Sequence, residues 1–177
     1  MLSSLVKRNV KQPLSIEMLA KLLPDYCRTA FYDDLAKFKN LRDALQGKKC
    51  LAVLYNIHDK AKNKLNRAGH FILINTLAGG VEYFSSSGWD VGKELDVTNS
   101  DPNIFKKLLG SNFKRNTHPL EKMGNSNDCW RFVLARAVLA SMPLKSFVKL
   151  FSHSLNLRNA DEICTLLTML MVSTQIN

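Results

Sequence analysis

The sequence predicts an α+β domain in which a small mixed or antiparallel sheet packs against one buried helix and several flanking helices. Residues 131–140 supply the buried helix, because two arginines are their only charges among apolar helix formers. The runs 49–57 and 70–75 supply strands, since both are short, apolar and bounded by polar residues. The chain has 177 residues and 46% hydrophobic content, so we expect residues 1–177 to form a single domain with a sizeable core.

The first part of the chain is expected to combine short helices with the first strand. Residues 14–23 have apolar positions at helical spacing, Ser15 is suited to cap them, and Pro24 ends them. Residues 26–35 fit either a strand or a loop. Residues 40–47 indicate one helical turn that their final glycine closes, directly before the strand 49–57.

A β-hairpin is expected after the basic segment 58–68, which we interpret as an exposed loop. The strand that begins at His70 pairs with residues 81–84 across a Gly-Gly loop of common hairpin length. This pairing returns the end of the second strand to the start of the first. Ser85 or Ser86 is therefore expected beside His70.

Small and amide residues at 124–128 lead directly into the buried helix. Such residues are typical of turns and helix caps, and Asn127 or Asp128 is the natural N-cap. Cys129 then lies in the first turn, where the partial positive charge of the helix end favours the thiolate over the thiol. This placement suits a nucleophile with an oxyanion site beside it. Taken alone, the alternative interpretation of Cys129 as one more buried cysteine is the stronger one.

Two packing helices are expected after the buried helix. The first follows Pro143, and its apolar positions recur at helical spacing up to Phe151. The second opens at residues 159–162 and has an apolar stripe that ends at Met171, with Cys164 inside it as a structural cysteine.

The four cysteines are scattered, without CxxC pairs or a Cys/His spacing typical of a metal site. We therefore expect free thiols in a reducing compartment and no bound zinc. No apolar run approaches the length that spans a membrane. The first residues lack the apolar region of a signal peptide.

The formal net charge of +10 predicts affinity for polyanions, nucleic acid above all, without sequence specificity. Lysines and arginines gather in several separate clusters. The cluster that leads into the His70 strand consists of Lys60, Lys62, Lys64 and Arg67. The alternative is that the charge serves only to keep the domain soluble.

Three segments in one chain order resemble the adenain and SUMO-protease superfamily of cysteine proteases. In that superfamily the catalytic residues come in the order His, acid, Cys. Its members have a Gly-His-Trp-like strand start, a Tyr-Phe-Asp-Ser strand end, and Gln-x-Asn-x-x-Asp-Cys-Gly at the core helix. The counterparts here are Gly69-His70-Phe71, Tyr83-Phe84-Ser85-Ser86-Ser87-Gly88 and Met123-Gly124-Asn125-Ser126-Asn127-Asp128-Cys129-Trp130.

The resemblance implies an adenain-like fold with His70 and Cys129 as the catalytic pair. Ser85 stands where the family has an acid. Its hydroxyl is able to hold the His70 ring, so we expect Ser85 to be the third member of the site. Ser86 is the second choice for this role, and Asp90 is the third.

Two further positions near Cys129 differ from the family pattern. Met123 stands where the family has the oxyanion Gln, and Trp130 replaces the Gly after the nucleophile. Methionine has no hydrogen-bond donor, so we expect the backbone N–H of Cys129 together with Asn125 or Asn127 to supply the oxyanion site.

By resemblance, the chain is expected to be a cysteine endopeptidase that processes viral, virophage or related precursor and capsid proteins. An isopeptidase for ubiquitin-like modifiers, and a catalytically degenerate nucleic-acid-binding or scaffold protein, are the alternatives. The resemblance implies that the enzyme needs no cofactor. It also implies that DNA or a peptide can activate the enzyme. It places the protein in an infected host, in the viral factory, nucleus or cytoplasm, and in the virion. The expected partners are a protein substrate and DNA, without a membrane.

Overall fold

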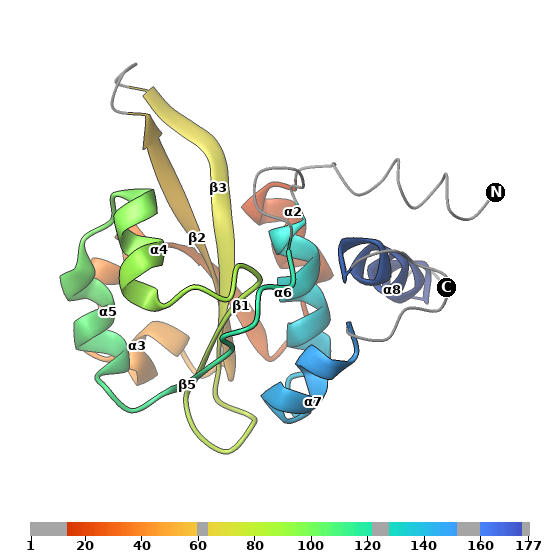
Figure 1. The fold of residues 1–177 in the computed structure, drawn as a ribbon. Helices are drawn as coiled ribbons and strands as arrows, with labels where there is room; N and C mark the ends of the chain where they lie inside the picture. The colour runs from red at the N-terminus through yellow and green to blue at the C-terminus, as the bar shows by residue number, and fades with distance from the viewer. Residues whose placement is uncertain (1–13, 60–63, 122–127, 152–159, 175–177) are drawn as a thin grey trace.

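A five-stranded sheet in the order β1-β2-β3-β4-β5 separates two layers of helices in the computed structural model (Figure 1). The structure describes residues 14–59, 64–121, 128–151 and 160–174. In chain order the elements are α2 (Ile16–Leu22), β1 (Cys27–Phe31), the 3-10 helix η1 (Asp33–Lys37), α3 (Leu41–Leu45), β2 (Cys50–Asp59), β3 (Lys64–Asn75), β4 (Glu82–Ser85), α4 (Val91–Thr98), α5 (Pro102–Leu109), β5 (Lys114–Arg115), α6 (Cys129–Val138), α7 (Leu144–Lys149) and α8 (Ala160–Thr174).

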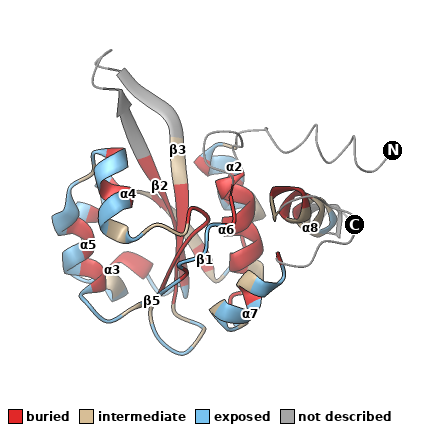
Figure 2. Cartoon of the chain, viewed as in Figure 1, coloured by how far each residue is buried: buried red, intermediate tan, exposed pale blue. Residues whose placement is uncertain are grey.

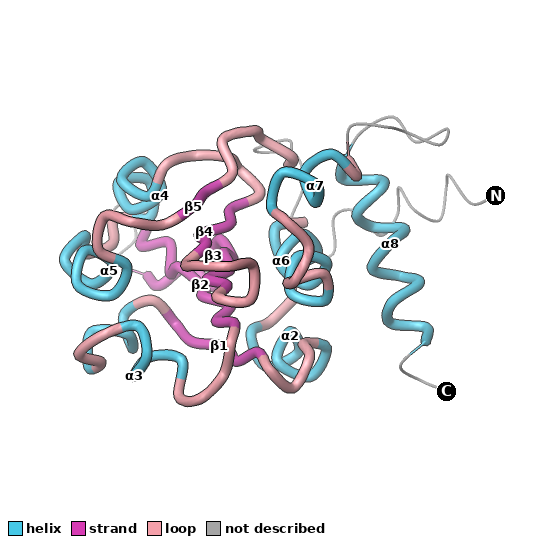
Figure 3. The backbone as a smooth tube through the Cα atoms, turned by 90° about the horizontal axis from the view of Figure 1, so that it is seen from below, coloured by secondary structure: helices cyan, strands magenta, loops and turns pink. Residues whose placement is uncertain are grey.

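The sheet is mixed, which confirms the expected α+β class. β2, β3 and β4 pair antiparallel, while the two outer pairs, β1 with β2 and β4 with β5, are parallel. Figure 3 shows α3, α4 and α5 on one side of the sheet and α2, α6, α7 and α8 on the other. Among the described residues, no helix combines the length and apolar character needed to cross a bilayer.

Alternation along the central strands gives each helical layer its own core. In β3, Phe71 and Leu73 pack with α6, whereas Ile72 and Ile74 pack with α4 and α5. Successive side chains of a strand point to opposite faces, so a strand that is apolar at every position is buried on both sides. The continuous apolar run 50–55 in β2 follows the same rule, and all of its residues are buried.

Most of the expected elements are present near their predicted bounds. Ser15 caps α2 by accepting a hydrogen bond from the Met18 N–H at 3.3 Å. The ambiguous segment 26–35 forms β1 and the start of η1. The predicted hairpin is also confirmed, with Ser85 at the end of β4 opposite Ile72 of β3.

The interpretation of residues 58–68 as a loop is wrong. β2 continues to Asp59 and β3 begins at Lys64, with His58 opposite Leu65. The two strands continue past the helices at one end of the sheet (Figure 1). Backbone hydrogen bonds between antiparallel strands do not need apolar side chains. The polar composition of this segment therefore gave no sign of the β2–β3 pairing.

A buried ion pair joins the helix α6 to the strand β4. The Arg136 guanidinium donates to both carboxylate oxygens of Glu82, from Nε at 2.7 Å and from Nη2 at 2.8 Å. Both side chains are fully buried. The same guanidinium donates to the carbonyl oxygens of Leu139, Ala140 and Met142, so it also closes the end of α6. The pair therefore fixes α6 against the centre of the sheet.

We expect Arg136→Met to lower the free energy of unfolding by about 3–5 kcal/mol, because it leaves the Glu82 carboxylate buried without its partner. Chemical denaturation measures this loss. Arg42→Met is the matched control, since Arg42 is exposed on α3. The double variant Glu82→Met/Arg136→Met should be more stable than Arg136→Met. Equal stability of Arg136→Met and Arg42→Met would show that the pair does not hold α6.

Candidate active site

His70 lies in β3 at the point where the strand passes beyond the end of β4. Gly69 precedes it beside an irregularity in the β2–β3 pairing, between Tyr55 and Ile57. A Cβ at Gly69 would overlap the carbonyl oxygen of Tyr55 and the side chain of Leu54. Only glycine therefore permits this approach of the two strands, and it sets the position of the His70 backbone.

One hydroxyl and one carboxylate lie against one edge of the His70 ring. Nε2 of His70 lies 2.9 Å from Ser85 Oγ and 3.4 Å from Glu94 Oε2. Ser85 and Ser87 both donate their hydroxyl protons to Glu94 Oε1. Because the Ser85 proton is directed to Glu94, Ser85 Oγ accepts from His70 Nε2–H. Glu94 is therefore the acid of this group, and Ser85 lies between it and the imidazole.

The other two choices for the third member have different roles. Asp90 is exposed and caps α4, accepting from the Lys93 N–H at 2.9 Å. Ser86 is buried, but its hydroxyl donates to Glu121 Oε2 at 2.6 Å. The structure thus brings Ser85 to His70 and leaves Ser86 and Asp90 with other partners.

The end of β4 is held by a buried amide. Asn116 Oδ1 accepts from the backbone N–H of Ser85 at 3.1 Å, and Asn116 Nδ2 donates to the Ser85 carbonyl at 2.7 Å. These two bonds continue the ladder past the last strand pair, so the Ser85 hydroxyl keeps one position relative to His70.

Cys129 is the first residue of α6, as expected, and α6 is buried over almost its whole length (Figure 2). Asp128 occupies the N-cap position, but its side chain makes no cap hydrogen bond. Instead it accepts from Thr165 of α8 at 3.3 Å and lies 3.3 Å from Arg131 Nε. Burial raises the pKa of Asp128 to about 7, with Arg131 opposing the shift. These contacts tie the start of α6 to α8.

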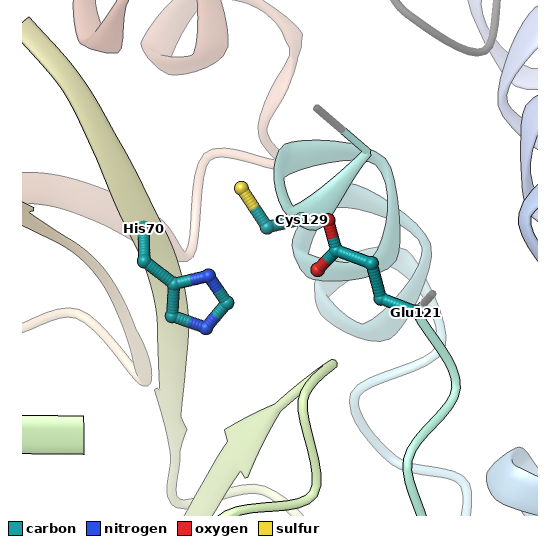
Figure 4. Close-up of side chains that lie close together, drawn as sticks. All are labelled: His70, Glu121 and Cys129. Atoms are coloured by element: carbon teal, nitrogen blue, oxygen red, sulfur yellow. The ribbon is translucent and has the colours of Figure 1, made fainter. Parts of the chain in front are cut away.

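The side chains of His70, Cys129 and Glu121 point toward one another (Figure 4). One imidazole nitrogen, the Cys129 Sγ and a Glu121 carboxylate oxygen all lie within 4.8 Å of one another. Since Nε2 faces Ser85 and Glu94, the nitrogen turned toward Cys129 is Nδ1. The His70 ring therefore bridges a thiol on the α6 side and a carboxylate on the α4 side.

The pKa values of His70 and Glu94 are displaced in opposite directions. Burial acts to lower the pKa of His70, but its contacts with Cys129 and Glu94 outweigh burial and raise it well above its usual value. Burial acts to raise the pKa of Glu94, but hydrogen bonds from His70, Ser85 and Ser87 hold it below its ordinary value. At neutral pH the pair is an imidazolium beside a carboxylate.

For several residues that the sequence predicts at a site, the structure describes no side chain. Asn125 and Asn127, expected at the oxyanion site, lie outside the described residues, as does Met123. Lys60 and Lys62 also lie outside them, and for Lys64 and Arg67 the structure describes only the backbone, in β3.

Sequence reasoning missed both carboxylates of the site. Glu94 lies in α4, nine residues after Ser85 and in a different secondary-structure element. Glu121 lies in the segment that leads toward α6. The available signal for Glu94 was its place in the first turn of a short helix, the next element after the second hairpin strand.

No protein-family model matches the chain, and no curated protein is significantly similar to it. The roles assigned to these residues are therefore argued from their geometry, burial and chemistry.

We expect Glu94→Gln to lower the pKa of His70, because the amide keeps the shape of the side chain and removes the negative charge. The ion pair of His70 and Glu94 stabilises the fold fully between about pH 4.3 and pH 6.5, which are the usual pKa values of Glu and His in unfolded chains. Its contribution is lost as pH falls through the lowered pKa of Glu94 or rises through the raised pKa of His70. Glu94→Gln should therefore cost most stability inside that window.

A titration of the His70 ring followed by NMR, in the presence of a chelator, measures this change. Asp96→Asn is the control, because Asp96 is an exposed carboxylate on the same helix. An unchanged His70 titration in Glu94→Gln would remove Glu94 as the partner of the imidazole.

Proposed function

We propose that this chain is a cysteine peptidase in which Cys129 is the nucleophile, His70 the general base and acid, and Glu94 with Ser85 the group that orients His70. One observation carries the proposal: the His70 ring has a thiol at one nitrogen and a buried serine–carboxylate pair at the other. A base held between a nucleophile and an orienting group is the arrangement that nucleophilic catalysis requires.

The proposed reaction proceeds through an acyl-enzyme. The Cys129 thiolate attacks the carbonyl carbon of the scissile peptide, and the His70 imidazolium gives its Nδ1 proton to the leaving amine as the C–N bond breaks. Neutral His70 then takes a proton from water while the oxygen of that water attacks the thioester. The thioester C–S bond breaks, which releases the acid product and restores the thiolate–imidazolium pair.

Glu94 and Ser85 contribute by holding the imidazole ring and its charge. The carboxylate stabilises the imidazolium, and the bond from Nε2–H to Ser85 leaves Nδ1 directed at Cys129. The oxyanion is expected to receive backbone N–H groups at the start of α6, where the helix dipole favours negative charge. Asn125 and Asn127 remain the expected side-chain donors.

The resemblance stated above supports a protein substrate. We propose that the enzyme cleaves viral or related element-encoded precursor proteins, at sites rich in small residues such as Gly-Gly or Gly-Ala. Removal of ubiquitin-like modifiers is the related isopeptidase reaction, and the same residues would carry it out.

A catalytically degenerate protein that binds nucleic acid or acts as a scaffold is the second candidate. The Glu121 carboxylate favours it, because a negative charge within 4.8 Å of Cys129 Sγ opposes both the thiolate and the developing oxyanion. Turnover of a substrate by the purified protein separates the two candidates.

We expect the protein to hydrolyse peptides with Gly-Gly or Gly-Ala sites. Cys129→Ala should abolish turnover, and His70→Ala should lower it by about 100-fold or more. Ser85→Ala should lower it less, because Glu94 remains beside His70. Mass spectrometry of the products, with ubiquitin-like conjugates as a parallel substrate, measures these rates. Cys27→Ala is the control thiol variant.

Turnover that survives Cys129→Ala would refute the assigned nucleophile. Absence of turnover on every substrate, in a folded wild-type protein, would favour the degenerate candidate.

We further propose that the basic charge binds DNA without reading its sequence, which would hold the enzyme in a nucleoprotein particle. Replacing Lys60, Lys62, Lys64 and Arg67 with Gln should weaken binding. For each DNA phosphate that the variant no longer neutralises, the plot of log affinity against log salt should become shallower by about 0.9. Fluorescence anisotropy with duplexes of unrelated sequence measures both quantities.

The matched control replaces Lys106, Lys107, Lys114 and Arg115 with Gln, because this removes the same charge from exposed positions elsewhere. Equal decreases in affinity in the two variants would show that net charge, and not the segment 60–67, governs binding. Wild-type affinity that does not depend on salt would refute the electrostatic account.

A further inference from the structure

We propose that His70, Cys129 and Glu121 form a site for Zn²⁺, and that zinc reversibly blocks the nucleophile. Glu121 is the unexplained member of the site, since the proposed peptidase reaction gives it no role and its charge opposes that reaction. The inference rests on the proposed function in one respect only: zinc is inhibitory because Cys129 is the nucleophile.

The three ligand types and their spacing suit zinc. Thiolate, imidazole and carboxylate are its protein ligands, with bonds of about 2.0–2.3 Å. In a tetrahedral site of that size the ligand atoms lie about 3.3–3.7 Å apart. The three atoms here already lie within 4.8 Å of one another, so side-chain adjustments of about 1 Å complete three corners of a tetrahedron. The fourth corner is left for water.

Each ligand is held in place by the structure around it. His70 would bind the metal through Nδ1 while Nε2–H is directed at Ser85 and Glu94, which is the carboxylate–histidine–metal arrangement of zinc proteins. Glu121 is held by the Ser86 hydroxyl at 2.6 Å, and its backbone N–H donates to the Ser86 carbonyl at 3.1 Å. Cys129 is fixed at the start of the buried helix α6.

The charges of the site also favour a dication. The Cys129 thiolate and the Glu121 carboxylate together neutralise Zn²⁺, and all three ligands are poorly exposed. Zinc binds the thiolate form of Cys129 and a His70 nitrogen without a proton, so the metal competes with protons for these ligands and its affinity should rise with pH. With both groups committed to the metal, neither attack by the thiolate nor protonation by the imidazole is possible.

Cobalt substitution tests the site without any substrate. Co²⁺ added to the metal-free protein should give one equivalent of binding with a thiolate-to-cobalt absorption band, and Zn²⁺ should displace it. Cys129→Ala should lose the band, whereas Cys27→Ala should keep it. Glu121→Gln should bind zinc about tenfold more weakly or worse in competition with a chromophoric chelator, while Glu17→Gln, the same change at an exposed glutamate of α2, should bind like wild type.

Thiol alkylation connects metal binding to the nucleophile. Zinc should slow the alkylation of Cys129 in wild type, and metal-free Glu121→Gln should alkylate faster than wild type because a neighbouring negative charge is gone. A cobalt spectrum without the thiolate band, or wild-type zinc affinity in Glu121→Gln, would overturn the site while leaving the peptidase proposal intact. Zinc binding that accelerates peptide cleavage would overturn the inhibitory role.

Discussion

The buried pair of Arg136 and Glu82 is the constraint on which the geometry of the site depends. It joins α6, the helix that carries Cys129, to β4 in the sheet. The register of β4 against β3 then places Ser85 beside His70. An ion pair fully removed from water is stable only with good geometry and satisfied hydrogen bonds, and Arg136 meets this condition through Glu82 and three carbonyl groups at the end of α6.

The two helical layers supply opposite halves of the site. Glu94 comes from α4 on one side of the sheet and Cys129 from α6 on the other. β4 ends at Ser85, opposite Ile72, so within the described part of the chain no strand pairs with His70 on that side, and its ring contacts groups from both layers. The raised pKa of His70 follows from this position, because its contacts with Cys129 at one end of the ring and with Glu94 at the other outweigh its burial.

Sequence reasoning located the parts of the site that local pattern determines. His70 and Ser85 follow from the hairpin register, and Cys129 follows from the cap and the apolar helix. Glu94 could not be placed in the same way, because a carboxylate in an amphipathic helix has the same pattern whether it faces solvent or a buried imidazole. Ser85 was assigned in place of the acid, whereas in the structure it lies between the imidazole and an acid from the next element.

The same limitation applies to the three residues proposed to bind zinc. The spacing rules for zinc sites recognise ligands that are close in sequence, and no such pair occurs here. His70, Glu121 and Cys129 come from three separate segments and meet only when α6 packs against the sheet. The sequence did not predict the extension of β2 and β3 beyond the core for a related reason. Backbone hydrogen bonds between strands do not require an apolar side-chain pattern, so a polar sequence does not indicate them.

The central claim is that Cys129 is an activated nucleophile, and the reactivity of the native thiols tests it most directly. All four cysteines are buried free thiols, and Cys27 is as little exposed as Cys129, at 8% against 7%, so exposure alone predicts equal rates for these two. Alkylation of the metal-free protein, with each cysteine quantified by mass spectrometry, should modify Cys129 at least about tenfold faster than Cys27, and His70→Ala should slow the alkylation of Cys129 itself by about tenfold or more. Equal rates for Cys129 and Cys27 in the wild-type protein would contradict the account.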